Sequence, residues 1–190
     1  METLTPMQYS PVGIALKKFL HTKLGARVGF ALGISGFNSI EAIIVRANGK
    51  VEKSRTFNSR VDKGADLTAS LLSGTSFNSI STPLPPKYIA LSTGSLTPAK
   101  GDTTLSSETS SSGMGRALGT QGTYTGPSVL DGAASYVVSK TFTASGNITI
   151  VSAALFDAVS SGNMFVEANL TSSAVLASGD TLTINWTINL

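Results

Sequence analysis

The last ten residues of the chain alternate between apolar and polar side chains. Large apolar residues occupy every even position from 182 to 190, and the odd positions from 181 to 189 hold only Thr and Asn. A period of two predicts a β-strand with one row of side chains in the core and one row facing outward. The outward row carries no charge, which favours packing against another protein surface over exposure as an active site.

Similar β-prone segments precede this strand. They begin near residues 87, 135, 147 and 163, and Gly, Ser, Asn or Asp residues separate them. Strands at this spacing are typical of antiparallel β-sandwiches rather than of parallel sheets. The sequence therefore predicts a mainly β protein in which residues 87–190 form an antiparallel β-sandwich, either Ig-like or a jelly roll.

The first part of the chain shows other patterns. Residues 10–25 place apolar side chains on one helical face behind a Ser-Pro start, which predicts one short helix. Residues 28–34 alternate as a strand with large apolar residues on one face and Gly or Ala on the other. Asn48-Gly49 lies between two β-prone runs in residues 41–57, which predicts a β-hairpin with a type I′ turn. Residues 65–72 have the pattern of one or two helical turns.

Proline marks the predicted domain boundary. Residues 82–86 read TPLPP, and prolines at this density favour an extended, semi-rigid linker. We therefore predict an N-terminal docking and assembly region over residues 1–82, a linker over 83–86, and the sandwich domain over 87–190. The N-terminal region would be an arm that carries the short helix and the hairpin.

Charge is distributed unevenly between these regions. Residues 1–66 hold ten Lys or Arg and five Asp or Glu, whereas residues 67–190 hold four and six. A basic N-terminal half can meet nucleic acid or an acidic protein surface, and it can equally be a solvated face. From its basic and aromatic residues we select eight candidate assembly contacts: Phe19, Arg27, Phe30, Arg46, Lys50, Lys53, Arg55 and Phe57.

Composition removes several kinds of chemistry. The chain has no Cys and only one His, so disulfides, thiolate metal sites and sites that need two imidazoles are excluded. The few acids after residue 66 lie mostly beside turn residues, where Asp commonly caps its own backbone. We therefore expect no enzymatic activity, no cofactor and no metal. Ser and Thr make up 49 of the 190 residues, typical of β-sheet surfaces that carry hydroxyls in place of charges.

Short motifs in residues 87–190 resemble a group of tailed-bacteriophage virion proteins, which are fibre-like, neck or head-associated. The motifs keep the order of that group, and in this sequence they read KYIAL at 87–91, TG at 93–94, PA at 98–99, GDT at 101–103 with Leu105 and Glu108, TFTA at 141–144, ALFD at 154–157, GNMF at 162–165 and GDTLTINWT at 179–187. The resemblance implies a structural role in a virion and no enzymatic activity.

Three functions follow from these observations. The first is a non-enzymatic virion protein that decorates or stabilises the capsid head or neck through its N-terminal region. The alternative is a tail-fibre or spike module that binds a host receptor or glycan, with Tyr124, Tyr136 or Trp186 stacking on sugars. The lesser alternative is nucleic-acid binding through residues 17–63.

The expected partners are other virion proteins, either the major capsid protein or neck proteins, together with further copies of the chain. Nucleic acid is the less favoured partner, because few aromatic residues are interleaved with the basic ones. No run of about 18 apolar residues occurs, so we expect no membrane contact. The N-terminus lacks the pattern of a signal peptide, and we expect synthesis in the host cytoplasm followed by incorporation into the virion.

Overall fold

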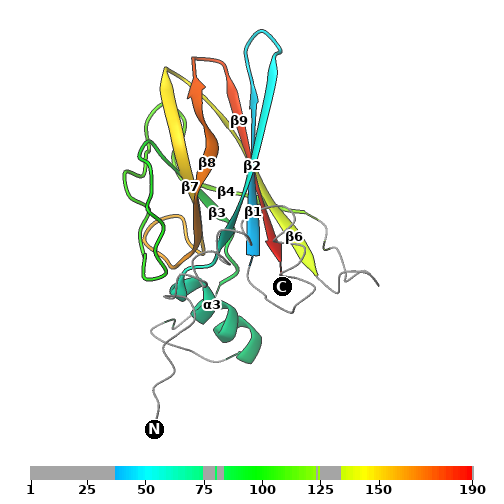
Figure 1. The fold of residues 1–190 in the computed structure, drawn as a ribbon, viewed down its shortest axis with the longest axis vertical. Coiled ribbons are helices and arrows are strands. Elements are labelled where there is room, and N and C mark those ends of the chain that lie inside the picture. The colour runs from blue at the N-terminus through cyan, green and yellow to red at the C-terminus, as the bar shows by residue number, and fades with distance from the viewer. Residues whose placement is uncertain (1–36, 75–79, 81–83, 123, 125–133, 190) are drawn as a thin grey trace, which may run out of the picture.

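The computed structural model describes residues 37–74, 80, 84–122, 124 and 134–189. Over these residues the protein is mainly β, as the sequence predicts, and its strands form two facing antiparallel sheets (Figure 1). The elements are β1 (Phe37–Val45), β2 (Val51–Ser59), α3 (Asp62–Ser73), β3 (Tyr88–Ser92), β4 (Ala117–Leu118), β5 (Thr120–Gln121), β6 (Ser135–Thr143), β7 (Ile148–Phe156), β8 (Met164–Leu176) and β9 (Thr181–Asn189).

The two sheets differ in size and in strand order. The five-stranded sheet has the order β2-β1-β9-β6-β5, and the four-stranded sheet has the order β4-β3-β7-β8. Each pair of hydrogen-bonded neighbours is antiparallel. Strand β9, which the alternating pattern predicted, lies in the middle of the five-stranded sheet between β1 and β6. The prediction of an antiparallel β-sandwich is therefore confirmed.

The hairpin of β1 and β2 belongs to this sandwich. Strand β1 pairs with β9 from Ser39 opposite Thr187 to Val45 opposite Thr181. The predicted division at residues 83–86 placed the hairpin in a separate N-terminal region, but strands from both sides of that division share one sheet. The reason is burial: every second side chain of β1 enters the same core as the inward row of β9. Among the described residues the sandwich thus begins at residue 37.

The hairpin turn differs from the predicted type. A type I′ turn needs a positive φ at both central residues, but of Asn48 and Gly49 only Gly49 has one, at 84°. The N–H of Gly49 donates to the carbonyl of Arg46 at 2.8 Å, and the N–H of Arg46 donates to the carbonyl of Lys50 at 2.8 Å. This is a three-residue loop that ends in a left-handed glycine, so the hairpin prediction is confirmed and its turn type is wrong.

Helix α3 lies where the sequence indicates one or two helical turns, and it is longer than that. It has 12 residues and ends at Gly74, whose left-handed backbone (φ 66°) lets its N–H donate to the carbonyl of Ser70 at 3.0 Å. It buries Leu67 and packs closely on β8, where a side chain at Gly64 would lie 2.1 Å from the carbonyl oxygen of Phe165. The helix predicted at 10–25 and the strand predicted at 28–34 lie outside the described residues.

The core lies between the two sheets and is centred on Trp186, whose side chain has no exposed surface. The inward rows of the central strands and of α3 belong to the same core as this ring. The largest fully buried side chains of this core are Trp186, Ile40, Leu67, Ile80, Ile89, Leu91, Met114, Ile150, Leu155 and Leu176.

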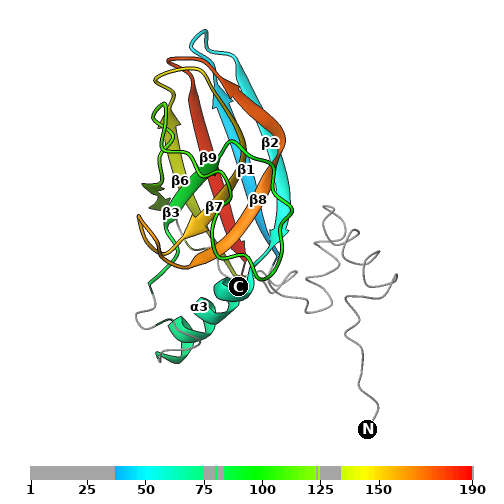
Figure 2. The same ribbon diagram turned by 90° about the vertical axis from the view of Figure 1, so that its left-hand side faces the viewer.

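The outer face of the four-stranded sheet is covered as well. A second apolar cluster lies there, formed by Val61, Ala90, Leu105, Ala154, Phe156 and Met164. Leu105 comes from the polar loop of residues 93–116, which runs across the face of β3, β7 and β8 in Figure 2. The sheet is therefore buried on both faces over much of its area, which explains why β3 and β7 hold continuous apolar runs rather than an alternation.

The two sheets are connected to each other along both sides of the sandwich. On one side, β4 pairs with β3 and β5 pairs with β6, so the chain passes from one sheet to the other at Gly119. A side chain at Gly119 would lie 2.7 Å from Val138, so only glycine fits this crossing. On the other side, a bridge joins Arg60 to Val166, and the hydroxyl of Thr171 donates to the carbonyl of Arg55 at 2.9 Å.

Candidate interaction surfaces

Three turns meet at one end of the sandwich, which we call the loop end: residues 46–50, 144–147 and 177–180. Asp180 connects them. Its carboxylate accepts the N–H of Ala47 at 2.8 Å and the N–H of Ala177 at 3.1 Å, and its backbone carbonyl accepts the N–H of Ala144 at 2.8 Å. The three turns are therefore held as one unit.

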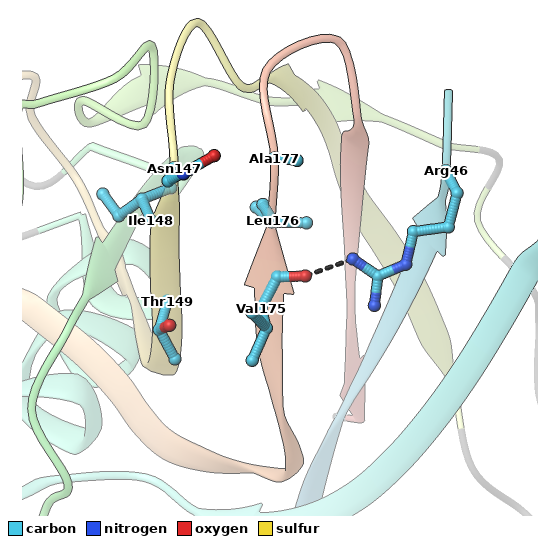
Figure 3. A pocket seen from close by; sticks show the side chains of 7 residues that line it. All are labelled: Arg46, Asn147, Ile148, Thr149, Val175, Leu176 and Ala177. Atoms are coloured by element: carbon cyan, nitrogen blue, oxygen red, sulfur yellow. Dashed lines mark hydrogen bonds between the residues drawn. The ribbon is translucent and has the colours of Figure 1, made fainter. Parts of the chain in front are cut away.

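Arg46 extends this network from the hairpin to β8. Its guanidinium donates to the carboxylate of Asp180 at 3.1 Å, to the carboxylate of Glu52 at 3.0 Å, and to the carbonyl of Val175. Figure 3 shows the side chain reaching across from β1 toward that carbonyl. Lys50 also pairs with Glu52, at 3.1 Å. Two of the predicted contact residues, Arg46 and Lys50, thus neutralise acids of the same module.

These contacts set the protonation of the loop end. Hydrogen bonds from Arg46 and Lys50 lower the pKa of Glu52, and the N–H groups of Ala177 and Ala47, followed by Arg46, lower the pKa of Asp180. Carboxylates with lowered pKa stabilise the fold above their unfolded pKa, and this contribution is lost as the pH falls through the folded pKa. The loop end therefore keeps its network at neutral pH and loses it in acid.

An open pocket of about 550 Å³ lies beside Arg46 (Figure 3). Its wall is made by the first residues of β7 with Asn147 before them, and by the last residues of β8 with Ala177 after them. Asn147 and Thr149 contribute polar side chains, and Val175 contributes an apolar side chain that is 59% exposed. Because the charge of Arg46 is neutralised by Glu52 and Asp180, the pocket suits a neutral, hydroxyl-bearing ligand better than an anion.

The other predicted contact residues are distributed differently. Lys53 and Arg55 lie on the outward row of β2, and the guanidinium of Arg55 donates to the hydroxyl of Ser39 at 2.9 Å. Phe57 lies within β2, but its side chain is outside the described part of the structure. Phe19, Arg27 and Phe30 are outside the described residues. The structure therefore brings together Arg46 and Lys50 at the loop end and Lys53 and Arg55 on the sheet face.

The outward side chains of the five-stranded sheet form rows across the strands, and we call this surface the outer ladder. One row joins Ser139, Asn185 and Glu41: Ser139 donates to the Asn185 side-chain oxygen at 2.7 Å, and the Asn185 amide donates to Glu41 at 3.0 Å. In the next row the hydroxyls of Thr141 and Thr183 lie 2.7 Å apart. The ladder consists of Val51, Lys53, Arg55, Glu41, Ile43, Val45, Thr181, Thr183, Asn185, Thr187, Asn189, Ser135, Val137, Ser139, Thr141 and Thr143.

A different polar group lies under the loop of residues 93–116. Glu167 on β8 is 2% exposed, and burial, followed by its hydrogen bond with Asp102 and the charge of that residue, raises its pKa to about 7. Asn169, two residues further along β8, accepts the N–H of Leu96 at 2.8 Å and donates to its carbonyl at 2.9 Å. Within the described chain, no three His, Cys, Asp or Glu residues are grouped to hold a metal ion. These contacts fasten the loop to β8.

The aromatic residues proposed for sugar stacking differ in exposure. Tyr124 is 56% exposed, whereas Trp186 is fully buried in the core and cannot stack on a ligand. Tyr136 packs against the core, and burial raises its pKa. Of the three, Trp186 is therefore excluded as a binding residue, and the glycan hypothesis depends on other side chains.

Sequence reasoning missed two residues that organise these surfaces. Asp180 is one of the acids that the sequence places beside turn residues, and Arg116 is not among the candidate contacts. Arg116 forms a double hydrogen bond with Glu108, at 2.7 and 2.8 Å, and its guanidinium carbon lies 3.6 Å from the ring centre of Phe156. One sequence feature could have drawn attention to Arg116: it is the only Lys or Arg between residues 101 and 139.

These features describe a β-sandwich that offers surfaces for contact. The described residues contain no helix with the length and hydropathy of a membrane span. The family model described as Podophage GP4 fiber I protein gp80 matches residues 65–187, more than half of the chain, so the chain belongs to this family. It is a structural protein of a phage virion, as the resemblance in residues 87–190 implied. The search of curated proteins gives no match.

Proposed function

We propose that this protein is a non-enzymatic fibre module that presents its loop end to the host surface. The printed name of the family is that of a fibre protein, which favours the fibre hypothesis over decoration of the capsid head or neck. Other virion proteins are the proposed partners at the opposite end of the module, with Phe19, Arg27 and Phe30 of the N-terminal region as proposed contact residues.

The observation that carries this proposal is the direction of the strands. The first residues of β1 pair with the last residues of β9, so residues 37 and 189 lie together at the end opposite the loop end (Figure 1). Chain connections to the rest of a particle would leave from that base. The loop end, with its three interlocked turns and its pocket, would then project outward. Binding residues commonly lie on loops that a rigid scaffold positions, as they do here.

A neutral glycan is the ligand that the pocket supports best. Asn147 and Thr149 offer hydrogen-bonding groups, and Val175 offers an apolar surface for the C–H face of a sugar ring. Neutralisation of Arg46 by Glu52 and Asp180 disfavours nucleic acid as the ligand at this end, because phosphate binding depends on uncompensated positive charge.

The test has two arms. Cryo-electron microscopy of the particle, with the protein labelled, should place it in a fibre. Purified protein should bind host cells and reduce phage adsorption, and the pocket-filling Thr149→Trp variant should weaken cell binding at least ten-fold. Thr104→Trp, at an exposed site on the loop of residues 93–116, is the matched control and should bind as the original protein does. Equal binding by both variants would exclude the pocket, and a label found only on the head would exclude the fibre.

A further inference from the structure

The outer ladder carries chemical groups that can bind the same groups on a second copy. Its two central strands, β1 and β9, and the neighbouring β6 present hydroxyl, carboxamide and aliphatic groups, with Glu41 as their only charge. A hydroxyl or a carboxamide both donates and accepts hydrogen bonds, so a surface made of these groups can bond to a copy of itself. A surface made of one sign of charge cannot do so without repulsion.

The ladder is also ordered before any contact forms. The row of Ser139, Asn185 and Glu41 and the pair of Thr141 and Thr183 are fixed by hydrogen bonds within the sheet. The Ser, Thr and Asn side chains among them are β-branched or short, and the carboxylate of Glu41 is held by Asn185, so little rotamer freedom remains for a partner to remove. Long charged side chains at these positions would lose more entropy when a second surface covers them.

The positions of the charges favour one arrangement of two copies. The basic residues Lys53 and Arg55 lie on β2, at one side of the ladder, and the outward row of β6 at the other side has no charge, because Lys140 lies opposite Ile184 in the inward row. A two-fold axis along the middle of the ladder, parallel to the strands and between β1 and β9, places β2 of one copy over β6 of the other. Lys53 and Arg55 of one copy then stay apart from those of the other, Glu41 of each copy faces Asn185 of its partner, and Ile43 faces Thr183 at the centre.

We propose that the outer ladder is the contact surface between two copies of this chain, packed face to face about such an axis. The inference rests on the proposed function, because a fibre module works among other copies in the virion. It names the surface that the expected self-association uses. It does not depend on whether the loop end binds a glycan.

The size of the ladder sets the expected strength. Four neighbouring strands of about 30 Å, spaced about 4.8 Å apart, give a face of roughly 600 Å² per copy. Two such faces bury roughly 1,200 Å², which is at the lower limit for specific protein–protein contacts. We therefore expect a reversible dimer in solution that is strengthened when a particle holds the copies close together.

The association is tested on the purified full chain by analytical ultracentrifugation over a range of concentrations. The original protein should dimerise reversibly, and Thr183→Arg should weaken the dimer at least ten-fold, because it places a long charged side chain against Ile43 of the partner. Ser173→Arg is the matched control, since Ser173 is exposed on β8 of the other sheet. A monomer at every concentration, or a Thr183→Arg dimer as strong as the original, would overturn the proposal.

A second measurement does not depend on the folding of the Arg variant. The chain has no Cys, so Thr183→Cys introduces the only thiol. Stacked sheets lie about 10 Å apart, too far for a disulfide but within reach of a short bismaleimide. Rapid cross-linking of Thr183→Cys but not of Ser173→Cys supports the proposal, and equal rates contradict it. Dimerisation without host-cell binding would reject the proposed function alone, and host-cell binding by a monomer would reject the ladder alone.

Discussion

The two sheets of this sandwich have similar inner faces and opposite outer faces. The outer face of the five-stranded sheet keeps a polar row on each strand, and β9 alternates strictly between buried and half-buried residues. The four-stranded sheet lies under the loop of residues 93–116, and four of the five residues of β3 are buried. The outer face of the four-stranded sheet is therefore covered by residues of the same chain. The outer face of the five-stranded sheet is a polar surface that a partner can cover.

This difference predicts where substitutions will matter. Side chains between the sheets should determine global stability, and side chains under the loop should determine how firmly that loop is held. Side chains of the outer ladder should matter little for stability and more for association.

The largest effect is expected at Trp186, which belongs to the core that both sheets share. Trp186→Ala should lower the free energy of unfolding by about 3–5 kcal/mol, because it removes a fully buried ring and leaves a cavity. Chemical denaturation followed by circular dichroism measures this loss. Trp186→Phe should lose clearly less, since it refills most of the space. A loss below about 1 kcal/mol for the Ala variant would mean that the core is not centred there.

A smaller, local effect is expected at Arg116, which holds the loop over the four-stranded sheet. Arg116→Ala removes the double hydrogen bond to Glu108 and the contact with the Phe156 ring, and it should cost about 2–3 kcal/mol. Hydrogen exchange should become faster for amides of residues 93–116 and stay slow in β9. Lys100→Ala, at an exposed site of the same loop, should change neither quantity. Uniform acceleration throughout the protein would contradict a local role.

Glu167 should make the stability of the covered sheet fall as the pH rises from acid to neutral. Its folded pKa of about 7 lies above the unfolded value, so its contribution to stability is full below about pH 4.5 and is lost as the pH rises through about 7. Glu167→Gln should therefore unfold at a higher denaturant concentration than the original protein at pH 8, and the two should differ less at pH 5.

Glu52 provides the comparison of opposite sign. Because its pKa is lowered, Glu52→Gln should destabilise the protein at pH 7, and the difference from the original protein should disappear in acid. If Glu167→Gln showed the same pH trend as Glu52→Gln, the buried position of Glu167 would be refuted.

The smallest effect on stability is expected on the outer ladder. Thr183→Ala removes one hydroxyl contact with Thr141 and should cost less than about 1 kcal/mol, as is usual for cross-strand pairs. Thermal unfolding monitored at a low concentration, where copies are separate, measures this cost. A loss of 3 kcal/mol would assign the ladder a structural role within one copy instead of a role between copies.

The same comparison explains what the sequence could predict. Strand β9 could be predicted from its alternating apolar and polar residues, because one of its faces is buried and the other is not. The covering of the four-stranded sheet by the loop of residues 93–116 could not be predicted. This loop is polar, and it contacts the sheet through a few separate residues such as Leu105 and Arg116. Strand pairing between β1 and β9 joins residues that are 136 to 148 positions apart, and no local pattern reports it.

The candidate surfaces were predictable only in part. The uncharged outward row of β9 and the basic residues of the hairpin were visible in the sequence. The role of Arg46 was not, because its partners Glu52, Asp180 and Val175 lie in three different segments. From sequence alone, a basic residue in a hairpin is interpreted as a contact to a partner. Its role within the fold becomes clear only when the structure shows the acid that neutralises it.

The crossing at Gly119 has a consequence for how copies can combine. Together with the bridge between Arg60 and Val166, it ties the two sheets to each other along both flanks. Strand edges that are engaged in this way are poor templates for the strands of a neighbour, which hinders open-ended polymerisation and the exchange of strands between copies. A two-fold contact through the outer ladder closes on itself, so it would join copies in pairs without starting a fibre.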